Sequence, residues 1–280
     1  MSFLTPLAHW VHDLDPVLIQ FTETIAIRWY GLAYIAGFLV ALGLLVLYER
    51  RGRSSLNRVE RESLFIALVI GVMAGGRFGY VLLYDTQRFF SDPLVLFRVW
   101  EGGMASHGGF IGVALALAWF CRRYGWSYRA LGDIVVTLAP AGLFFGRIAN
   151  FINGELWGKV SDVPWAVVFP QSLPGYPVES IAARHPSQLY AAFLEGLVLF
   201  IFIQWRFWQS ANLTRYPGQI AGEFLVAYAG LRIIGELFRE PDASLIMGLS
   251  RGTFYSLLVA LIGVAVILWA RKAPQSSEKS

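Results

Sequence analysis

Residues 62–84 read ESLFIALVIGVMAGGRFGYVLLY, and this stretch decides the fold of the chain. Apart from Glu62 and Arg77 it carries no charged side chain. About 20 apolar residues in helical conformation cross a hydrocarbon core about 30 Å thick. Because lipid offers no hydrogen-bond partner to backbone amides, a segment that crosses it must be helical. The stretch therefore predicts a transmembrane helix.

Apolar blocks of similar length follow one another through the rest of the 280 residues. Hydrophobic residues make up 56% of the sequence and charged residues only 15%, whereas soluble domains average about 25% charged residues. We predict an all-α, polytopic integral membrane protein with seven transmembrane helices, in which residues 1–272 form one domain and residues 273–280 a disordered tail. The predicted spans are residues 27–48, 62–84, 106–121, 130–150, 188–207, 219–238 and 253–270.

Lysine and arginine residues gather in every second loop. The segments 49–61, 122–129 and 206–218, together with the C-terminal tail, hold 13 of the 23 basic residues. Since basic loops stay in the cytoplasm, we predict an outer N-terminus and a cytoplasmic C-terminus. These loops also explain the net charge of +4 better than nucleic-acid binding does. The first basic residue is Arg28, so no cleavable signal peptide is expected.

Four segments are then predicted to lie on the outer side: residues 1–26, 85–105, 151–187 and 239–252. The segment 151–187 is rich in proline, glycine and aromatic residues, and we expect it to form a small ordered periplasmic cap. Arg88 and Arg98 lie in the segment 85–105 and could contact lipid phosphates.

Ionisable and polar residues collect near the predicted outer ends of the spans. Charges inside a membrane are costly and are functional candidates by default. Arginine binds phosphate in a bidentate manner, so several arginines at one depth suggest an anionic phospholipid headgroup. The residues at this level are Tyr30, Arg77, His107, Arg147, Asn150, Arg232, Glu236 and Arg239.

Several of these residues also have a simpler interpretation. Arg232 and Glu236 are four residues apart and could neutralise each other on one helix face. Tyr30, next to a tryptophan, could anchor the chain at the membrane interface, and His107 could be structural. Gly71, Gly75 and Gly79 form two overlapping GxxxG patterns that favour close helix packing. Alternatively, their bare backbone could let a headgroup approach Arg77.

A short stretch at the exit of the fourth predicted span is chemically unusual. Residues 146–158 read GRIANFINGELWG and place two asparagines, an arginine and a glutamate together. This stretch resembles the signature of the prolipoprotein diacylglyceryl transferase family. Further resemblances to that family cover most of the chain: RWYG (28–31), GGRFGY (75–80), FRVWEGGM (97–104), SHGG (106–109), RHPSQLY (184–190) and FREPD (238–242).

The resemblance implies an enzyme of the bacterial inner membrane that uses phosphatidylglycerol. It would transfer the diacylglyceryl group to the lipobox cysteine of a prolipoprotein and release glycerol-1-phosphate, without a metal or a cofactor. The positions critical in the family fall on Tyr30, His107, Arg147 and Arg232. Other family positions fall on Asn150, Glu155, Gly158 and Glu236.

Displacement of phosphate from a glycerol carbon by sulfur requires a base and a phosphate-binding group. His107 is the candidate base, because histidine ordinarily titrates near pH 6.5; it could instead bind the headgroup or support the turn at Gly108 and Gly109. Arg147 and Arg232 are expected to offset the charge on the departing phosphate, and Asn150 and Asn153 to supply neutral donors. Glu155 or Glu236 is expected to hold an arginine in place, and Tyr30 to hydrogen-bond the headgroup. The remaining members of the predicted substrate site are Arg77, Gly158 and Arg239.

Two other classes of membrane protein compete with this interpretation. A phospholipid transporter or flippase would carry its polar site near the bilayer midplane and would often contain internal repeats, whereas the polar residues here gather at one face. Another phospholipid-using transferase would need a metal-bound carboxylate pair, and no such spacing occurs. Cys121 is the only cysteine, which excludes an intrachain disulfide and favours a role in helix packing.

Overall fold

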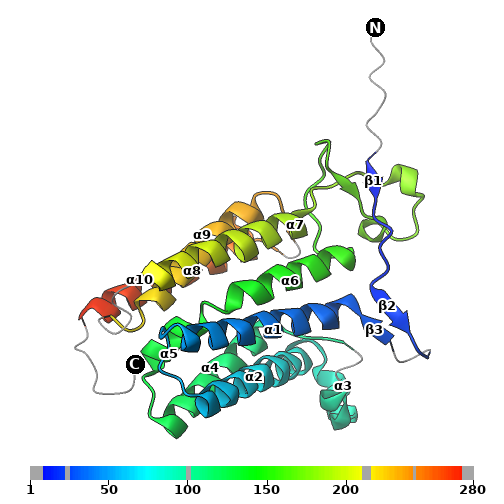
Figure 1. Cartoon of the computed structure of the whole chain (residues 1–280). Helices are drawn as coiled ribbons and strands as arrows, with labels where there is room; N and C mark the ends of the chain where they lie inside the picture. The colour runs from blue at the N-terminus through cyan, green and yellow to red at the C-terminus, as the bar shows by residue number, and fades with distance from the viewer. Residues whose placement is uncertain (1–8, 23–25, 99–101, 210–215, 242–243, 273–280) are drawn as a thin grey trace. The chain divides into compact units, whose positions relative to one another are not determined.

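The computed structural model describes residues 9–22, 26–98, 102–209, 216–241 and 244–272 (Figure 1). The predicted disordered tail, residues 273–280, lies outside the described residues. Within them the chain is mostly helical, which agrees with the predicted fold class. Four short strands that the sequence analysis did not predict add to the helices: β1 (Trp10–Val11), β2 (Val17–Gln20), β3 (Ala26–Arg28) and β4 (Val167–Val168).

Helices occupy all seven predicted spans. In the second half of the chain one long helical segment is made of three consecutive pieces, of which the middle one, η5, is a π-helix. The main helices are α1 (Trp29–Arg50), α2 (Arg58–Tyr84), α4 (Ser106–Tyr124), α5 (Tyr128–Val135), α6 (Ala139–Ile152), α7 (Ser187–Ala191), η5 (Ala192–Val198), α8 (Leu199–Gln209), α9 (Gln219–Glu236) and α10 (Arg251–Lys272). Shorter helices are α3 (Thr86–Ser91), η1 (Pro93–Phe97), η3 (Pro170–Ser172) and η4 (Val178–Ser180).

Four of these helical segments, among the described residues, are long and apolar enough to cross a membrane: α1, α2, the continuous segment Ser187–Gln209, and α10. A fifth is counted when α5 and α6 are taken together as one broken span. Helices α4 and α9 also occupy predicted spans, but they do not meet this criterion, and α9 carries Glu223, Arg232 and Glu236. The chain is thus a helical membrane protein, and the number of seven spans stays a prediction.

The chain divides into two compact units. Unit 1 comprises Met1–Leu39, Val136–Gln209 and Gln219–Trp269, and unit 2 comprises Val40–Val135, Ser210–Gly218 and Ala270–Ser280. Each unit is described separately below.

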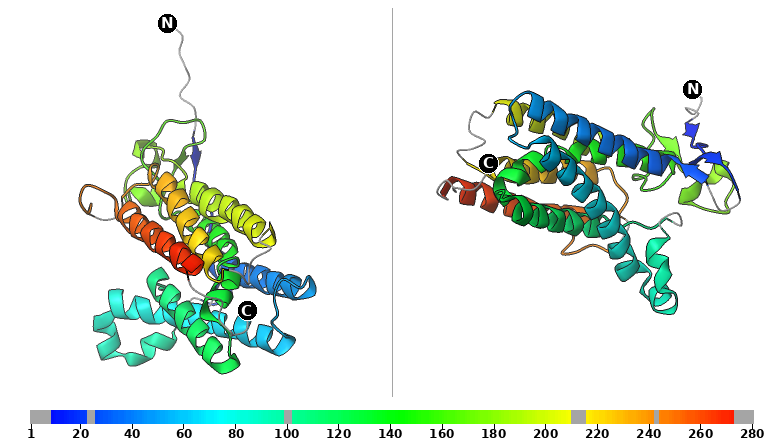
Figure 2. Two further views of the ribbon diagram at one scale, coloured as in Figure 1. Left: turned by 90° about the vertical axis from the view of Figure 1, so that its left-hand side faces the viewer. Right: turned by 60° about the horizontal axis from the view of Figure 1, so that its bottom comes forward.

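In unit 2, helices α2 and α4 lie side by side and pack closely against each other (Figures 1 and 2). A Cβ atom added to Gly71 would lie 2.6 Å from the carbonyl oxygen of Gly112, and one added to Gly79 would lie 2.7 Å from the Cα of Gly108. Gly75 lies between them and meets the backbone of both α4 glycines. The overlapping GxxxG patterns therefore serve close helix packing.

In unit 1, the π-helical piece η5 contacts both α6 and α9, and α8 runs beside α9 (Figure 1). Gly196 of η5 brings the two backbones close, because a Cβ there would lie 2.8 Å from the Cα of Phe144 on α6. These contacts bring together the helix ends that carry the polar residues predicted from the sequence.

The segment 151–187, which we call the cap segment, is ordered in unit 1. Strand β1, near the N-terminus, pairs in parallel with β4 of the cap segment, and β2 pairs with β3 in an antiparallel hairpin that leads into α1. A small apolar core supports the cap segment and is formed by Ala166, Val168, Ile181 and Ala183, with Val11 and Val163 against it. The parallel pairing of β1 with β4 was not anticipated from the sequence.

The glycine contact between α2 and α4 makes a direct prediction. A methyl group in Gly75→Ala would collide with backbone, which cannot move aside as a side chain can, so we expect a loss of about 1–3 kcal/mol in stability. The matched control is Gly43→Ala on α1, where a Cβ meets nothing within 4 Å and where alanine favours the helix by about 0.5–1 kcal/mol. Thermal unfolding midpoints in detergent micelles measure both. Equal midpoints would contradict the contact.

Candidate active site

A chain of alternating charges joins three helical segments of unit 1. Glu195 of η5 has no solvent exposure, and its two carboxylate oxygens bind different arginines. One lies 3.0 Å from Arg147 Nη2 on α6, and the other lies 3.1 Å from Arg232 Nη1 on α9. A buried carboxylate is tolerated only when it is paired, so Glu195 holds both guanidinium groups in defined positions.

The chain of charges continues along α9. Arg232 also forms an ion pair with Glu236, an interaction that the sequence analysis left open as the simpler interpretation of these two residues. The Nε atom of Arg239 lies 3.9 Å from Glu236 Oε1, the oxygen that Arg232 also contacts. The Ser250 hydroxyl donates to Glu236 Oε2 at 2.7 Å. Glu236 is buried, and it is the predicted glutamate that holds an arginine in place.

Sequence reasoning missed Glu195, which is the central residue of this network. Its signal was nevertheless present, because Glu195 is the only charged residue between 188 and 205 in a predicted span, and charges inside membranes are functional candidates. It lies in a π-helical turn. This conformation is rare in proteins as a whole, but where it occurs it is often found at a functional site. The structure pairs Arg147 with Glu195, which was not among the glutamates predicted to hold an arginine in place.

Arg147 keeps one donor unused. Its Nε atom is buried and has no hydrogen-bond partner among the described residues. An unsatisfied buried donor is costly, and it is the kind of group that a ligand oxygen satisfies. Arg147 therefore offers a binding contact in addition to its pair with Glu195.

A second polar cluster forms at the end of α6. The amides of Asn150 and Asn153 donate to the same oxygen of Glu155, at 2.8 Å and 3.3 Å. Within the described part of the chain, the Glu155 carboxylate is thus oriented by neutral amide donors. Tyr30, at the start of α1, hydrogen-bonds the Asn150 side chain and interacts electrostatically with Glu155 and Arg147. The structure therefore brings Tyr30 to the signature residues.

Gly158 and Arg239 meet at the edge of the cap segment. They form an isolated antiparallel bridge, and the Gly158 amide donates to the carbonyl oxygen of His185 at 2.9 Å. A Cβ at Gly158 would lie 2.6 Å from that oxygen, so a glycine is needed for the close approach of the two backbones.

Burial and the nearby Lys159 ammonium group lower the pKa of His185, whose ring contacts the Tyr190 hydroxyl at 3.1 Å.

In unit 2, Arg77 is buried and its guanidinium group binds backbone carbonyls. Nη2 donates to Val95 at 2.5 Å, Nη1 donates to Gly103 at 3.3 Å, and Nη1 also binds the Gly102 carbonyl. These bonds attach the segment that follows α3 to helix α2. The structural function of Arg77 is therefore visible, and its contact with a lipid headgroup stays a prediction.

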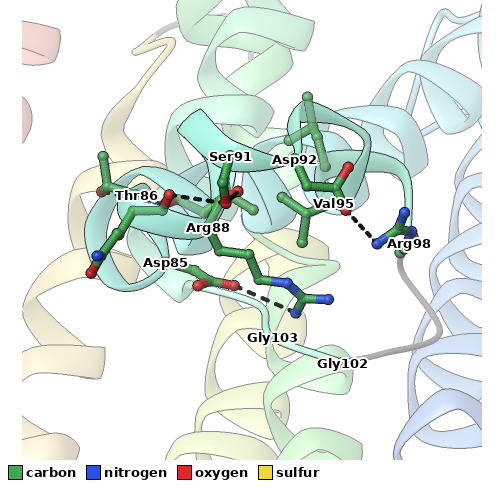
Figure 3. A network of polar contacts seen from close by, with 12 residues as sticks. Asp85, Thr86, Arg88, Ser91, Asp92, Val95, Arg98, Gly102 and Gly103 are labelled. Carbon is green, nitrogen blue, oxygen red and sulfur yellow. Dashed lines mark hydrogen bonds and ion pairs between the residues drawn. The ribbon is translucent and has the colours of Figure 1, made fainter.

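Two other arginines of the predicted outer segment 85–105 have acidic neighbours (Figure 3). Arg98 lies 2.6 Å from Asp92, and Arg88 lies 3.8 Å from Asp85. All four side chains are partly exposed. The two pairs shape the short helices α3 and η1, and exposed pairs of this kind contribute little to stability.

His107 is exposed and lies in the first turn of α4, directly before the glycine that contacts α2. Tyr30, Arg147, Asn150, Asn153, Glu155, Gly158, Arg232, Glu236 and Arg239 belong to unit 1, whereas Arg77 and His107 belong to unit 2. That all these residues form one site stays a prediction.

The apolar helices and the buried chain of arginines and glutamates define a class: a helical membrane protein with a guanidinium-rich polar site. Residues 16–269 match the sequence profile of the family described as prolipoprotein diacylglyceryl transferase. The chain belongs to this family, which consists of bacterial membrane enzymes.

Named relatives agree over nearly the whole length. The chain is 45% identical over 265 residues to the phosphatidylglycerol–prolipoprotein diacylglyceryl transferase of Rhodospirillum rubrum, with 93% of each chain covered. It is 43% identical over 263 residues to the enzyme of that name from Vibrio atlanticus, covering 93% of this chain and 92% of the relative. For the Proteus mirabilis enzyme the identity is 40% over 286 residues, with 96% of each chain covered. Membership in a transferase family decides against the transporter alternative.

The position of Glu195 predicts a large effect of a small change. Glu195→Gln keeps the side-chain shape but removes the charge that Arg147 and Arg232 share. Because a hydrogen bond to a charged group contributes about 1.5–3 kcal/mol, we expect enzymatic activity to fall about 10-fold or more.

The matched control is Glu223→Gln on α9. It breaks a bidentate pair with Arg206, whose two hydrogen bonds are 2.7 Å and 2.8 Å long. This pair is not part of the Glu195 network. We expect this variant to remain active at a temperature at which both variants are folded. Equal losses in the two variants would show that the position of Glu195 has no special importance.

Proposed function

We propose that this protein transfers the diacylglyceryl group of phosphatidylglycerol to the lipobox cysteine of prolipoproteins. The observation that carries this proposal is the pair of arginines, Arg147 and Arg232, on one fully buried carboxylate. The substrate is a phosphodiester, and planar guanidinium groups suit phosphate oxygens. The curated relatives carry names that state the same two substrates.

The reaction can be written with its atoms balanced. The cysteine sulfur attacks the carbon of the diacylglyceryl group that is bonded to a phosphate oxygen. A carbon–sulfur bond forms there while the bond between that carbon and the phosphate oxygen breaks. The bonding electrons leave with the phosphate of glycerol-1-phosphate, and the thiol proton passes to a base. The products are a thioether-linked lipoprotein and glycerol-1-phosphate.

We assign roles to this chain's residues on that basis. Arg147, through its unpaired Nε, and Arg232 stabilise the charge that gathers on the leaving phosphate. Tyr30 and Asn150 bind the headgroup, supported by their mutual hydrogen bond and by the orientation of Glu155. Asn153, Gly158, Glu236, Arg77 and Arg239 complete or support the substrate site. His107, which is exposed, accepts the thiol proton.

The same proposal includes the membrane arrangement. Seven helices cross the bacterial inner membrane, with the N-terminus outside and the C-terminus in the cytoplasm, and residues 1–272 act as one catalytic domain. The cap segment then lies on the periplasmic side, where prolipoproteins emerge. The basic residues in alternate loops and the helices at all seven predicted positions support this arrangement.

The function is tested with the purified full-length protein in vesicles. A synthetic lipobox peptide should gain the mass of a diacylglyceryl group when phosphatidylglycerol is present, with release of glycerol-1-phosphate. The controls are a peptide with serine in place of cysteine and vesicles of phosphatidylethanolamine alone. Unmodified peptide with the native protein in phosphatidylglycerol vesicles would refute the proposal.

The role of His107 predicts a distinctive pH dependence. His107→Ala should lose transfer at pH 7 and regain part of the rate at pH 9, because thiols ionise near pH 8.5 and the substrate then attacks as thiolate. Pre-steady-state rates at saturating phosphatidylglycerol, measured for the native and variant enzymes across this range, give the comparison. An equal loss at both pH values, or full activity in His107→Gln, would assign the residue to binding or to the turn.

The proposed orientation is tested with reporter fusions. A reporter active only in the cytoplasm should work when it is fused after Ser280 and should fail when it is fused within the outer segment, after Asp92. A reporter active only in the periplasm should give the reverse result. The opposite pattern at either position would overturn the span assignment.

A further inference from the structure

The turn that carries Glu155 is held by side chains from other parts of unit 1. Four consecutive carbonyl oxygens, from Asn153 to Leu156, each accept a hydrogen bond from a side chain outside the turn. In the amide orientation that satisfies both bonds, the Gln171 nitrogen donates to Asn153 at 2.9 Å and to Gly154 at 3.2 Å. Gln188 donates to Glu155 at 2.5 Å, and Ser187 donates to Leu156 at 2.8 Å.

The turn needs such support because its backbone is unfavourable. Gly154 has a φ of +64°, and Leu156 has a φ of +59°, which is uncommon for a residue that is not glycine. A backbone of this kind persists only where the surroundings determine it. The side-chain bonds to the carbonyl oxygens provide that determination.

His12 acts on the same turn from the N-terminal segment. It is buried, and its Nε2 atom lies 2.7 Å from the carbonyl oxygen of Phe151, in the last turn of α6. A carbonyl oxygen only accepts hydrogen bonds, so Nε2 carries the hydrogen. The ring also covers Gly154, because a Cβ added there would lie 3.1 Å from the His12 Cε1 atom.

His12 itself is fixed by the pairing of β1 with the cap segment. Its amide donates to the Val168 carbonyl oxygen at 2.8 Å, and its ring packs 5.3 Å from Phe169 and 5.5 Å from Phe151, between ring centroids. The later part of the cap segment thus supports the turn directly through Gln171. It also supports the turn indirectly, because it fixes His12, which binds Phe151 and covers Gly154.

These contacts converge on one functional group. Asn153 and Glu155 lie on the held turn, and Asn150 lies in the last turn of α6 directly before it. The amides of both asparagines orient the Glu155 carboxylate. A shift of the turn therefore moves the Glu155 carboxylate and changes its electrostatic interaction with Tyr30. Misplacement by about 1 Å can lower an enzymatic rate about 100-fold.

We propose that His12 and Gln171 are positioning residues that set the orientation of Glu155. The N-terminal segment and the later part of the cap segment then hold the turn from Asn153 to Leu156, the signature turn, between them as a clasp. Both residues lie outside the short motifs that the sequence analysis compared with the transferase family. The proposal rests on the proposed function, because its readout is diacylglyceryl transfer.

The test removes each donor while keeping side-chain size. His12→Phe retains the ring packing and loses the bond to Phe151, and Gln171→Met retains the length and loses both amide bonds. A neutral hydrogen bond contributes about 0.5–1.5 kcal/mol, so we expect kcat/KM for phosphatidylglycerol to fall about 2- to 13-fold in each variant. His12→Gln, which can donate from its Nε2, should recover most of the loss.

Transfer is measured at a temperature at which thermal unfolding shows every variant to be fully folded. The matched control is Ser180→Ala, which removes a bond of 2.7 Å from a side chain to the Pro177 carbonyl oxygen in the cap segment, away from the turn. We expect this control to transfer at the native rate.

The outcomes separate the two proposals. Native-like transfer by His12→Phe and Gln171→Met, or a loss that disappears when the variants are fully folded, would overturn the clasp and leave the proposed function intact. If His12→Phe does not fold, Gln171→Met and His12→Gln decide the question. Absence of transfer by the native protein would overturn the proposed function and the clasp with it.

Discussion

The structure of unit 1 depends on a carboxylate that has no contact with solvent. Glu195 lies in a helical segment surrounded by apolar side chains, where an unpaired charge would be prohibitively costly. Its two oxygens therefore require two cations, and Arg147 and Arg232 provide them from two neighbouring helices. Since removing one partner of a buried pair costs about 3–5 kcal/mol, the pairing determines the axial positions of α6, η5 and α9 relative to one another. The same constraint leaves the guanidinium groups preorganised for an anionic substrate.

The signature turn after α6 follows a related principle with neutral groups. Its carbonyl oxygens cannot be satisfied by helix or sheet, because the backbone has left both conformations at Gly154 and Leu156. Amide and hydroxyl side chains from the cap segment and from α7 bind them instead, as buried backbone groups require. The result is a loop that is as well supported as a helix and that presents Glu155 in one orientation. Catalytic groups benefit from such rigidity, because little ordering is left for the moment of reaction.

In unit 2, backbone atoms make the closest contacts between α2 and α4 at their glycine positions. Glycines let α2 and α4 approach until their main chains touch, a favourable arrangement where water does not drive association. Arg77 then donates to a carbonyl oxygen within η1 and to the carbonyl oxygens of Gly102 and Gly103 before α4, which satisfies donors and acceptors together. His107 lies in the first turn of α4, next to Gly108, whose backbone contacts α2.

The sequence by itself determined the features that depend on neighbours along the chain. Apolar runs of spanning length predicted the helices, and the stretch 146–158 indicated the family. The four-residue spacing of Arg232 and Glu236 made their ion pair one of two open interpretations. Only the tertiary structure revealed that Glu195 joins Arg147 to Arg232, that β1 pairs with β4, and that His12 and Gln171 bind the signature turn. The physical reason is sequence separation. Helical and apolar periodicities report contacts within a few residues, whereas Arg147 and Glu195 are 48 positions apart and His12 and Phe151 are 139 apart. No local pattern specifies such partners, and they are decided only when the helices and the cap segment pack.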